Sequence, residues 1–521
     1  MSDTLIRALE NPAVYPHPAS SVQRIETHIS WVLLTGEHAY KIKKPMDFGF
    51  LDFTTLEARK YYCEEELRLN RRTAPDLYET LVSFCGSPEA PEIREGIHAD
   101  AFEYGLRMRQ FSPDEVLDEI PLDHPKMPEW LDSLTESLAR LHAGAPAAGA
   151  DVPWGDPEEV FAPVQQNFDQ IQPMLRDDSE KARLKTIEEW ARDTYARLRP
   201  LMAQRKAEGF VRECHGDVHL GNVALMNGEV RLFDCIEFNE SFRWTDTWCD
   251  LGFLLMDLED RGRDDLAARV LNHYLEWTGD FEGLQLLAFY KSYRAMVRCK
   301  IALLTLANPE LGPDSRRELE VRYSNYIELA ERYMGLPNRF CIAMCGLSGS
   351  GKTTVSSELL ETMHAVRIRS DVERKRLFGL EPLAVSADTG QNIYTPEATA
   401  RTYERVAELS ARVLEYGYPV IADATYLRRE ERARLEDVAE AHAVPFVLVR
   451  CTADDSLIEQ WLEERKAQGR DAAEADVKVF RKQKAQLEEL DEAEQRHCLT
   501  VDTTDLEAVR KLARRLGAQF S

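Results

Sequence analysis

The stretch HGDVHLGN at residues 215–222 sets Asp217 five residues before Asn222. In phosphoryl transfer, an aspartate can accept the proton of the attacking hydroxyl while an asparagine at this interval holds Mg²⁺. One short match is weak evidence. The neighbouring sequence must therefore supply the other parts of such a site: a second metal ligand, a cation for the nucleotide phosphates and a carboxylate that holds this cation.

A hairpin predicted directly after this loop brings a second metal ligand to it. VALMNGEVRLFD at 223–234 reads as two strands around Asn227-Gly228, and Asn-Gly between apolar residues is a strong signal for a two-residue hairpin loop. In that register Asn222 ends opposite Phe233, so Asp234 lies beside Asn222. Because oxygen ligands suit a hard cation, the spacing predicts a Mg²⁺ site made by Asn222 and Asp234.

The cation and its carboxylate are expected upstream. Lys41 and Lys43 alternate onto one face of a strand predicted at HAYKIKKP, and the helix that follows carries Glu64, Glu65 and Glu66. We favour Lys41 and Glu65 as the pair at the nucleotide phosphates.

A second nucleotide site is indicated by GLSGSGKT at 346–353, which fits GxxxxGK[ST] between an apolar strand and a helix. Lys352 would reach the β- and γ-phosphates, and the Thr353 hydroxyl would ligate Mg²⁺. Backbone N–H groups and the helix N-terminus would bind the remaining phosphate oxygens. The expected nucleotide-binding residues here are Gly346, Ser348, Gly349, Ser350, Gly351, Lys352, Thr353 and Thr354, with Arg465 and Arg470 in a segment that closes over the phosphoryl group.

Three further residues are expected on the acceptor side of this second site. Asp371 is predicted at the C-terminal end of the second strand of this half, three residues before Arg374, and Asp423 ends the third strand. The carboxyl ends of parallel strands face the ligand crevice. We expect Asp371 to act as the base, Arg374 to hold an anionic part of the substrate, and Asp423 to orient Mg²⁺ and its waters beside the substrate.

The elements that position these residues follow two patterns. Strands and turns with one helix fill roughly the first hundred residues, and a mostly helical region follows from Asp114 to Met334, interrupted by a β segment at 211–238. After GLPNRF, apolar strands alternate with amphipathic helices, which is typical of a parallel sheet. We therefore place one domain at 1–337, with lobes at about 1–112 and 113–337, and a second at 338–521.

Composition excludes several classes of protein. The 521 residues are 44% apolar and 30% charged, without an apolar run of the ~18 residues that a membrane span needs. The ten cysteines show no disulfide or zinc-site spacing. The net charge of −26 counts against nucleic acid or an acidic membrane as a partner. We expect a cytoplasmic protein that acts on small molecules.

The first half resembles the aminoglycoside phosphotransferase family at HGDVHLGN, LFDCIEF and WTDTWCDLGF, over about residues 25–335. The resemblance implies an α+β kinase-like two-lobed fold and ATP-dependent phosphorylation of a hydroxyl on a small molecule. By this resemblance Asp217 would orient the acceptor hydroxyl, and Asp250 would hold the catalytic loop in place.

The second half resembles P-loop kinases of the polynucleotide kinase, zeta-toxin and gluconate kinase group at GLSGSGKTT, SDVERK and IADATYLRREER. This resemblance implies an α/β doubly wound parallel-sheet P-loop domain, with Asp371 as the base and Arg374 as a substrate contact. The whole arrangement is similar to bacterial fusions of the two domain types.

We therefore predict a tandem kinase that uses ATP and Mg²⁺ to phosphorylate hydroxyl groups of small molecules at two separate sites. Two alternatives stay open. The second half is a 5'-hydroxyl polynucleotide kinase in one, and the whole protein is a regulatory ATP-binding protein without phosphotransfer in the other.

Overall fold

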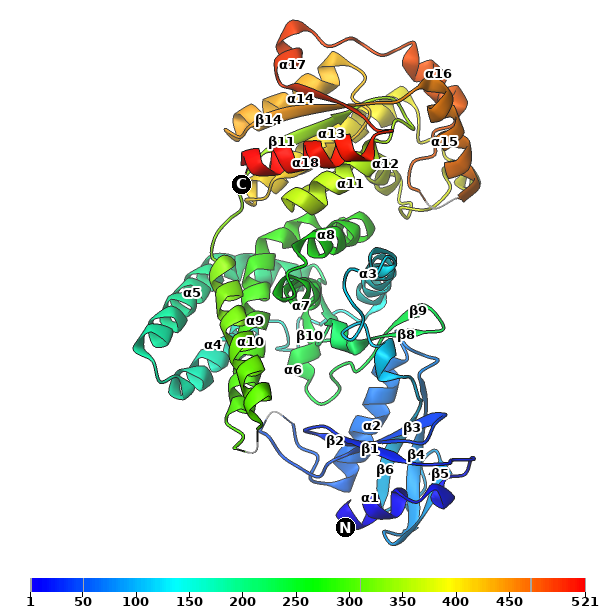
Figure 1. The fold of residues 1–521 in the computed structure, drawn as a ribbon, viewed down its shortest axis with the longest axis vertical. Coiled ribbons are helices and arrows are strands. Elements are labelled where there is room, and N and C mark those ends of the chain that lie inside the picture. The colour runs from blue at the N-terminus through cyan, green and yellow to red at the C-terminus, as the bar shows by residue number, and fades with distance from the viewer. Residues whose placement is uncertain (1, 50, 310, 469–470, 521) are drawn as a thin grey trace. The chain divides into compact units, whose positions relative to one another are not determined.

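The computed structural model describes residues 2–49, 51–309, 311–468 and 471–520, and Figure 1 shows their fold. By contacts between residues, the chain forms two compact units, Met1–Asp257 and Leu258–Ser521. The helices α8 (Asp264–Thr278), α9 (Leu284–Leu306) and α10 (Pro313–Arg332) thus belong by contact to the second unit, although we expected them in the first domain. The domain boundary near 337 stays a prediction.

The first unit begins with an antiparallel sheet of six strands in the order β1-β2-β3-β6-β4-β5. Its strands are β1 (Gln23–Glu26), β2 (Ser30–Leu34), β3 (His38–Lys43), β4 (Tyr78–Ser87), β5 (Ala90–Glu95) and β6 (Glu103–Arg109). Helix α1 (Ser2–Leu9) packs with Tyr40 and Ile42 of β3, whereas helix α2 (Leu56–Asn70) packs on the side of Ala39. Because side chains alternate along a strand, Lys41 and Lys43 share the α2 side with Ala39.

The rest of this unit is helical around two small sheets. Strand β7 pairs with β10, and β8 pairs with β9, both antiparallel. The helices are α3 (Met127–Gly144), α4 (Pro157–Ile171), α5 (Asp178–Ala207), α6 (Glu240–Arg243) and α7 (Thr247–Asp260), and the strands are β7 (Val211–Glu213), β8 (Val223–Met226), β9 (Glu229–Leu232) and β10 (Trp244–Asp246). Short 3₁₀ turns lie at η1 (Pro12–Val14), η2 (Pro113–Glu115), η3 (Gln172–Met174) and η4 (Leu220–Asn222).

The second unit contains a parallel sheet of five strands in the order β12-β13-β11-β14-β15. The strands are β11 (Cys341–Cys345), β12 (Val366–Arg369), β13 (Val420–Asp423), β14 (Phe446–Thr452) and β15 (Cys498–Asp502). The helices after α10 are α11 (Lys352–Met363), α12 (Ser370–Leu377), α13 (Pro396–Glu415), α14 (Arg429–Ala441), α15 (Asp455–Gln468), α16 (Val477–Lys484), α17 (Glu492–Arg496) and α18 (Leu506–Phe520). The 3₁₀ turn η5 (Phe281–Gly283) precedes α9, and η6 (Ser386–Thr389) lies between α12 and α13. The predicted α/β fold of this half is confirmed.

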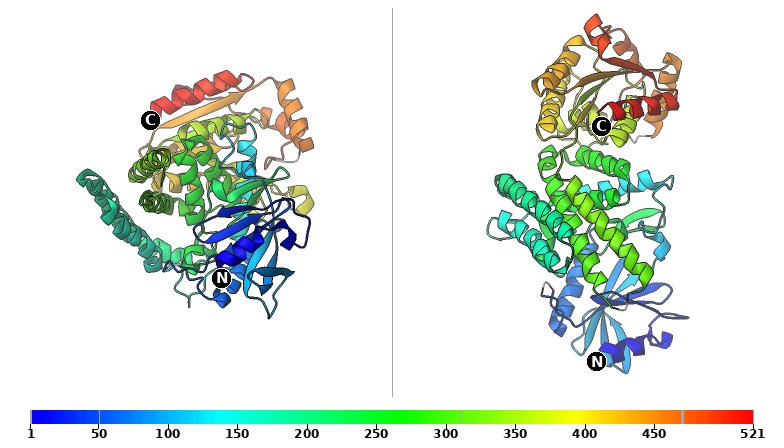
Figure 2. Two further views of the ribbon diagram at one scale, coloured as in Figure 1. Left: turned by 60° about the horizontal axis from the view of Figure 1, so that its bottom comes forward. Right: turned by 60° about the vertical axis from the view of Figure 1, so that its left-hand side comes forward.

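The core of the second unit lies between this sheet and the helices α11 and α18, which pack side by side (Figure 2). Ile342, Met344 and Ile421 of the sheet meet Leu359 of α11, and Ala268 of α8 joins the same buried cluster. The central strand β11 leads directly into the P-loop, with β13 and β14 on its two sides. This is the position at which doubly wound sheets bind ligands. Among the described residues, no helix is both long and apolar enough to cross a membrane.

Candidate active sites

The catalytic loop of the first unit connects β7 to the turn η4. The side-chain amide nitrogen of Asn222 donates to the backbone oxygen of Asp217 at 2.9 Å and to its Oδ2 at 3.0 Å. Nε2 of His219 lies 3.4 Å from the same Oδ2. Asp217 and Asn222 therefore meet as the interval predicts. Because the amide nitrogen of Asn222 makes both bonds, its amide oxygen is the atom that could ligate a cation.

Asp250 of helix α7 holds this loop in place through the loop backbone. Its fully buried carboxylate accepts hydrogen bonds from the backbone N–H groups of His215 at 2.7 Å and Gly216 at 2.8 Å. Gly216 has φ 90°, and a Cβ there would meet the backbone oxygen of Phe242 at 3.0 Å. His142, Cys214 and Asp250 lie close enough together for a metal ion. However, burial raises the pKa of the Cys214 thiol, and the Asp250 carboxylate already serves the loop. We assign this cluster a structural role.

The hairpin brings Asp234 to the loop in the predicted register. Val223 pairs with Leu232, and the backbone N–H of Phe233 donates to the backbone oxygen of Asn222 at 2.9 Å. Asp234 then takes a left-handed conformation with φ 62°. Its Oδ1 lies 2.6 Å from Nζ of Lys41. The carboxylate of Asp234 and the amide of Asn222 supply hard oxygen donors that suit Mg²⁺.

The lysine partner in helix α2 is Glu66, and the favoured choice of Glu65 is wrong. Oε1 of Glu66 lies 2.7 Å from Nζ of Lys41, and Oε2 lies 2.6 Å from Nζ of Lys43. Lys43 also pairs with Glu237. Burial alone would raise the pKa of Glu66, but Lys41 and Lys43 lower this pKa to about 2. Adjacent helical residues point about 100° apart, so only one of them can face β3.

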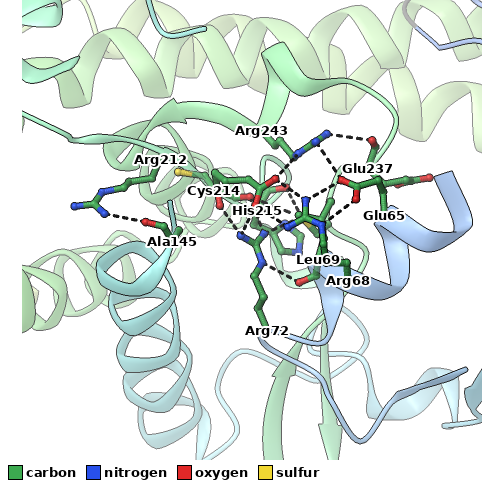
Figure 3. Close-up of polar contacts among 12 residues, drawn as sticks. Glu65, Arg68, Leu69, Arg72, Ala145, Arg212, Cys214, His215, Glu237 and Arg243 are labelled. Atoms are coloured by element: carbon green, nitrogen blue, oxygen red, sulfur yellow. Dashed lines mark hydrogen bonds and ion pairs between the residues drawn. The ribbon is translucent and has the colours of Figure 1, made fainter. Parts of the chain in front are cut away.

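Glu65 instead belongs to an arginine network that joins helix α2 to the strand before the catalytic loop (Figure 3). Arg68 binds Glu65 and Glu213 through Nη2, at 2.7 Å each. Nε of Arg243 reaches Glu213 at 3.3 Å, and Nη1 of Arg72 donates to the backbone oxygen of Glu213 at 2.7 Å. These contacts fix the chain two residues before His215. The role predicted for Glu65 at the nucleotide has no geometric support.

The P-loop of the second unit follows β11 and opens helix α11 at Lys352. Gly349 and Gly351 have φ 82° and 78°, and a Cβ at Gly346 would meet the backbone oxygen of Cys451 at 2.6 Å. Ser350 is 2% exposed, and its backbone oxygen accepts from the Thr503 hydroxyl at 3.0 Å. Gly349 and Gly351 are thus required by the backbone conformation of the turn, and Gly346 is required because strand β14 lies close to it.

A cleft of about 910 Å³ opens above this loop. The predicted residues that line it are Ser348, Gly349, Gly351, Lys352, Thr353, Thr354, Asp371, Arg374, Asp423 and Arg465. Gly346 and Ser350 are not among the lining residues. Arg470 lies outside the described residues. The structure thus brings most of the predicted set together, and the role of each residue stays a prediction.

Within the cleft, several side chains are held by the protein itself. Nζ of Lys352 donates to the backbone oxygen of Leu347 at 2.8 Å, and burial lowers the pKa of this lysine. Oδ2 of Asp423 accepts from the Ser356 hydroxyl at 2.9 Å. Asp371 lies in the first turn of α12, because β12 ends two residues earlier than we predicted.

Arg374 is 7% exposed and is fixed by the segment between α12 and α13. Its Nη1 donates to the backbone oxygen of Ile393 at 3.1 Å and lies 3.3 Å from the Thr399 hydroxyl. The guanidinium stacks over Tyr394 at 5.2 Å from the ring centre. This segment had no assignment from the sequence, and Tyr394, which lines the cleft, was missed.

Arg369 was also missed, although the sequence held a signal for it. Arg367 and Arg369 alternate with apolar residues in AVRIR at 365–369. Arginines on a buried strand need carboxylate partners. Those partners come from α8 and from the loop after α15, and no local pattern in the sequence joins them to β12.

Residues 61–287 match the model of the phosphotransferase enzyme family, and residues 341–490 match the model of an AAA domain. The chain thus joins a region that matches the phosphotransferase enzyme family to a P-loop region that matches an AAA domain. Both predicted resemblances are thereby confirmed, and the protein is an enzyme of the kinase type. The uncharacterized protein Rv2004c of Mycobacterium tuberculosis is 28% identical over 437 residues, 82% of this chain and 83% of that protein.

Two solved structures are each similar to part of the chain. A choline/ethanolamine kinase family protein from Mesorhizobium loti is 14% identical and covers 64% of this chain and 99% of its own, with a TM-score of 0.38. A gluconokinase from Sinorhizobium meliloti is 19% identical and covers 36% of this chain and 99% of its own, with a TM-score of 0.25.

Proposed function

We propose that the protein is a cytoplasmic tandem kinase. Each site transfers the γ-phosphoryl group of Mg·ATP to a hydroxyl group of a small molecule. The observation that supports this proposal is that each compact unit brings together a lysine, oxygen-bearing side chains and an aspartate: Lys41, Asn222, Asp234 and Asp217 in the first unit, and Lys352, Thr353, Asp423 and Asp371 in the second. Such sets position reactants and neutralise charge, and these two effects supply most of the rate in phosphoryl transfer.

At the first site, Lys41 binds the phosphates and Glu66 holds its ammonium group in place. Asp234 and the amide oxygen of Asn222 would hold Mg²⁺. When bound, ATP would supply the phosphoryl group and Mg²⁺ the positive charge that stabilises its transfer. Asp217 orients the acceptor hydroxyl and receives its proton at the carboxylate, whose position is set by the Asn222 amide.

At the second site, Lys352 leaves the Leu347 carbonyl and binds the phosphates with the N–H groups of the P-loop. The Thr353 hydroxyl would hold Mg²⁺, and Asp423 would lie on the metal side of the site. Asp371 accepts the proton of the acceptor hydroxyl, and Arg374 binds an anionic part of the acceptor. Arg465, whose Nη2 donates to the Ala475 backbone oxygen at 2.8 Å, closes the cleft from the side of α15.

A small acceptor fits the second cleft better than a polynucleotide. Its lining holds both signs of charge: the cationic residues Lys352, Arg369, Arg374, Arg428, Arg434, Arg465 and Lys482, and the acidic residues Asp371, Asp423, Glu430, Glu431, Asp471, Glu474 and Asp476. A polyanion would meet these carboxylates and a chain of net charge −26. Turnover stimulated by oligonucleotides with free 5'-hydroxyls, and weakened by salt, would favour the polynucleotide kinase instead.

The test is to incubate the protein with γ-labelled ATP and a cell metabolite extract, and to compare wild type with Asp217→Ala and Lys352→Ala. We expect each variant to lose a different subset of labelled products. The same products from all three proteins would contradict the two-site proposal. ATP binding without any labelled product would favour the regulatory alternative.

A further inference from the structure

Helix α8 packs against β12, the edge strand of the parallel sheet. The side chain of Asn272, 1% exposed, donates from Nδ2 to the backbone oxygen of Ala365 at 2.9 Å and accepts at Oδ1 from the backbone N–H of Arg367 at 2.5 Å. The amide thus makes the two hydrogen bonds that a neighbouring strand would make to β12. Together with Ala268 in the sheet core, this contact fixes the next turn of α8 beside the P-loop site.

Glu276, one turn after Asn272, binds both arginines of β12. Its Oε1 lies 2.7 Å from Nη2 of Arg367, and its Oε2 lies 3.2 Å from Nη1 of Arg369. The side chain of Glu276 is only 11% exposed. Burial would raise the pKa of Glu276, but the two arginines lower this pKa to about 2, so the group is charged at neutral pH.

Arg367 connects Glu276 to the residues on the metal side of the site. Its Nη1 donates to the hydroxyls of Ser357 at 2.8 Å and Ser356 at 3.1 Å, and lies 3.4 Å from the backbone oxygen of Thr353. The Ser356 hydroxyl in turn donates to Oδ2 of Asp423 at 2.9 Å. The Arg367 guanidinium therefore supports both residues expected at Mg²⁺: it contacts the backbone of Thr353 directly, and it contacts Asp423 through Ser356.

Arg369 leads from Glu276 to the acceptor side. It lines the cleft two residues before Asp371, and its Nη2 lies 2.6 Å from Oδ1 of Asp471 in the loop after α15. Without Glu276, Arg369 would keep Asp471 and would also be drawn toward Asp423, with which it already interacts electrostatically. Asp423 would then be pulled away from Ser356.

We propose that Glu276 is a positioning residue for the P-loop site, which holds Arg367 and Arg369 so that Thr353, Asp423 and the acceptor side of the cleft keep their geometry. Glu276 lies within residues 61–287, which match the phosphotransferase family model. A helix of the first family match thus completes the site of the second. This gives a physical reason for both domain types to occur in one chain, and it rests on the proposed function of the second site.

The test compares Glu276→Gln, which keeps shape and removes charge, with Arg269→Ala. Arg269 is a matched control because it joins the same helix α8 to α11, through Glu361 at 3.0 Å, away from the cleft lining. In the Asp217→Ala background, with the metabolite extract as acceptor, we expect kcat of Lys352-dependent transfer to fall about 10- to 100-fold in Glu276→Gln. Affinity for AMP-PNP at saturating Mg²⁺ should match that of Arg269→Ala, with both variants assayed well below their thermal unfolding midpoints. Glu276→Asp should restore part of kcat.

A second measurement does not depend on turnover. In the Lys41→Ala background, the Mg²⁺ concentration that half-saturates AMP-PNP binding should rise about tenfold in Glu276→Gln and stay unchanged in Arg269→Ala. Equal effects of the two substitutions on kcat and on this Mg²⁺ dependence would overturn the positioning role. If wild type makes no Lys352-dependent product, the proposed transfer fails, and the Mg²⁺ measurement still decides the role of Glu276.

Discussion

Replacing Glu66 by glutamine removes the carboxylate shared by Lys41 and Lys43 in the first unit. Glu66 is fully buried, and each of its oxygens pairs with one ammonium group. Glutamine keeps the shape but cannot balance either charge, so the two ammonium groups of β3 would depend on Asp234 and Glu237 alone. We expect both the free energy of unfolding of this unit and its affinity for nucleotide to fall.

The size of the effect follows from the ion pairs. The fall of the pKa of Glu66 from 4.5 to about 2 corresponds to about 3 kcal/mol of net stabilisation of the charged carboxylate, after the cost of its burial. Removing one partner of a buried ion pair costs ~3–5 kcal/mol, which agrees with this figure. For a unit of this size, with an m-value of about 3 kcal/mol/M, the urea midpoint should fall by about 1 M.

The assay is urea unfolding followed by tryptophan fluorescence, because six of the eight tryptophans lie in Met1–Asp257. Glu65→Gln is the matched control. Glu65 is adjacent, and its partners Arg68 and Arg243 also contact Glu213, so we expect a cost below about 1 kcal/mol. In the Lys352→Ala background, KM for ATP should rise about tenfold or more for Glu66→Gln alone. An equal or larger loss in Glu65→Gln would refute the assignment of Glu66 as the lysine partner.

Three other predictions concern single contacts. The Ser348 N–H of the P-loop donates to Oε1 of Gln483 at 2.8 Å, so this N–H is occupied. Gln483→Ala removes the competing acceptor and should tighten AMP-PNP binding at this site about fivefold. Weaker binding would mean that Gln483 contacts the nucleotide. Asp250→Asn should lower Asp217-dependent transfer about tenfold or more and leave Lys352-dependent transfer unchanged, and a uniform loss at both sites would contradict this. Because the pKa of Glu276 is lowered from 4.5 to about 2, its stabilisation is complete above about pH 4.5 and is lost as the pH falls toward 2. The difference in unfolding free energy between wild type and Glu276→Gln should therefore close in that range, and a constant difference would argue against the ion pairs.

Local patterns predicted the parts of each site that lie on one short segment. The Asn-Gly turn sets the register that brings Asp234 to Asn222, and both turn residues have the positive φ of such a loop, 55° and 82°. The P-loop motif sets its own backbone through its glycines. In both cases sequence spacing and geometry are linked directly, because few residues separate the groups.

Contacts between distant segments were not predictable in the same way. Helical periodicity cannot tell whether Glu65 or Glu66 faces β3, because the orientation of α2 depends on packing against the whole sheet. Glu276 and Arg369 are far apart in sequence, and only the docking of α8 on β12 joins them. The arginines of β12 indicate that buried partners must exist, yet nothing local indicates which ones.

The central claim is that one chain holds two independent nucleotide sites, and a calorimetric titration with Mg²⁺ and AMP-PNP tests it most directly. We predict two molecules bound per wild-type chain and one in each of Lys41→Ala and Lys352→Ala, with the remaining affinity in each variant equal to one of the two wild-type affinities. A single molecule bound per wild-type chain, or loss of both by either substitution, would contradict the claim.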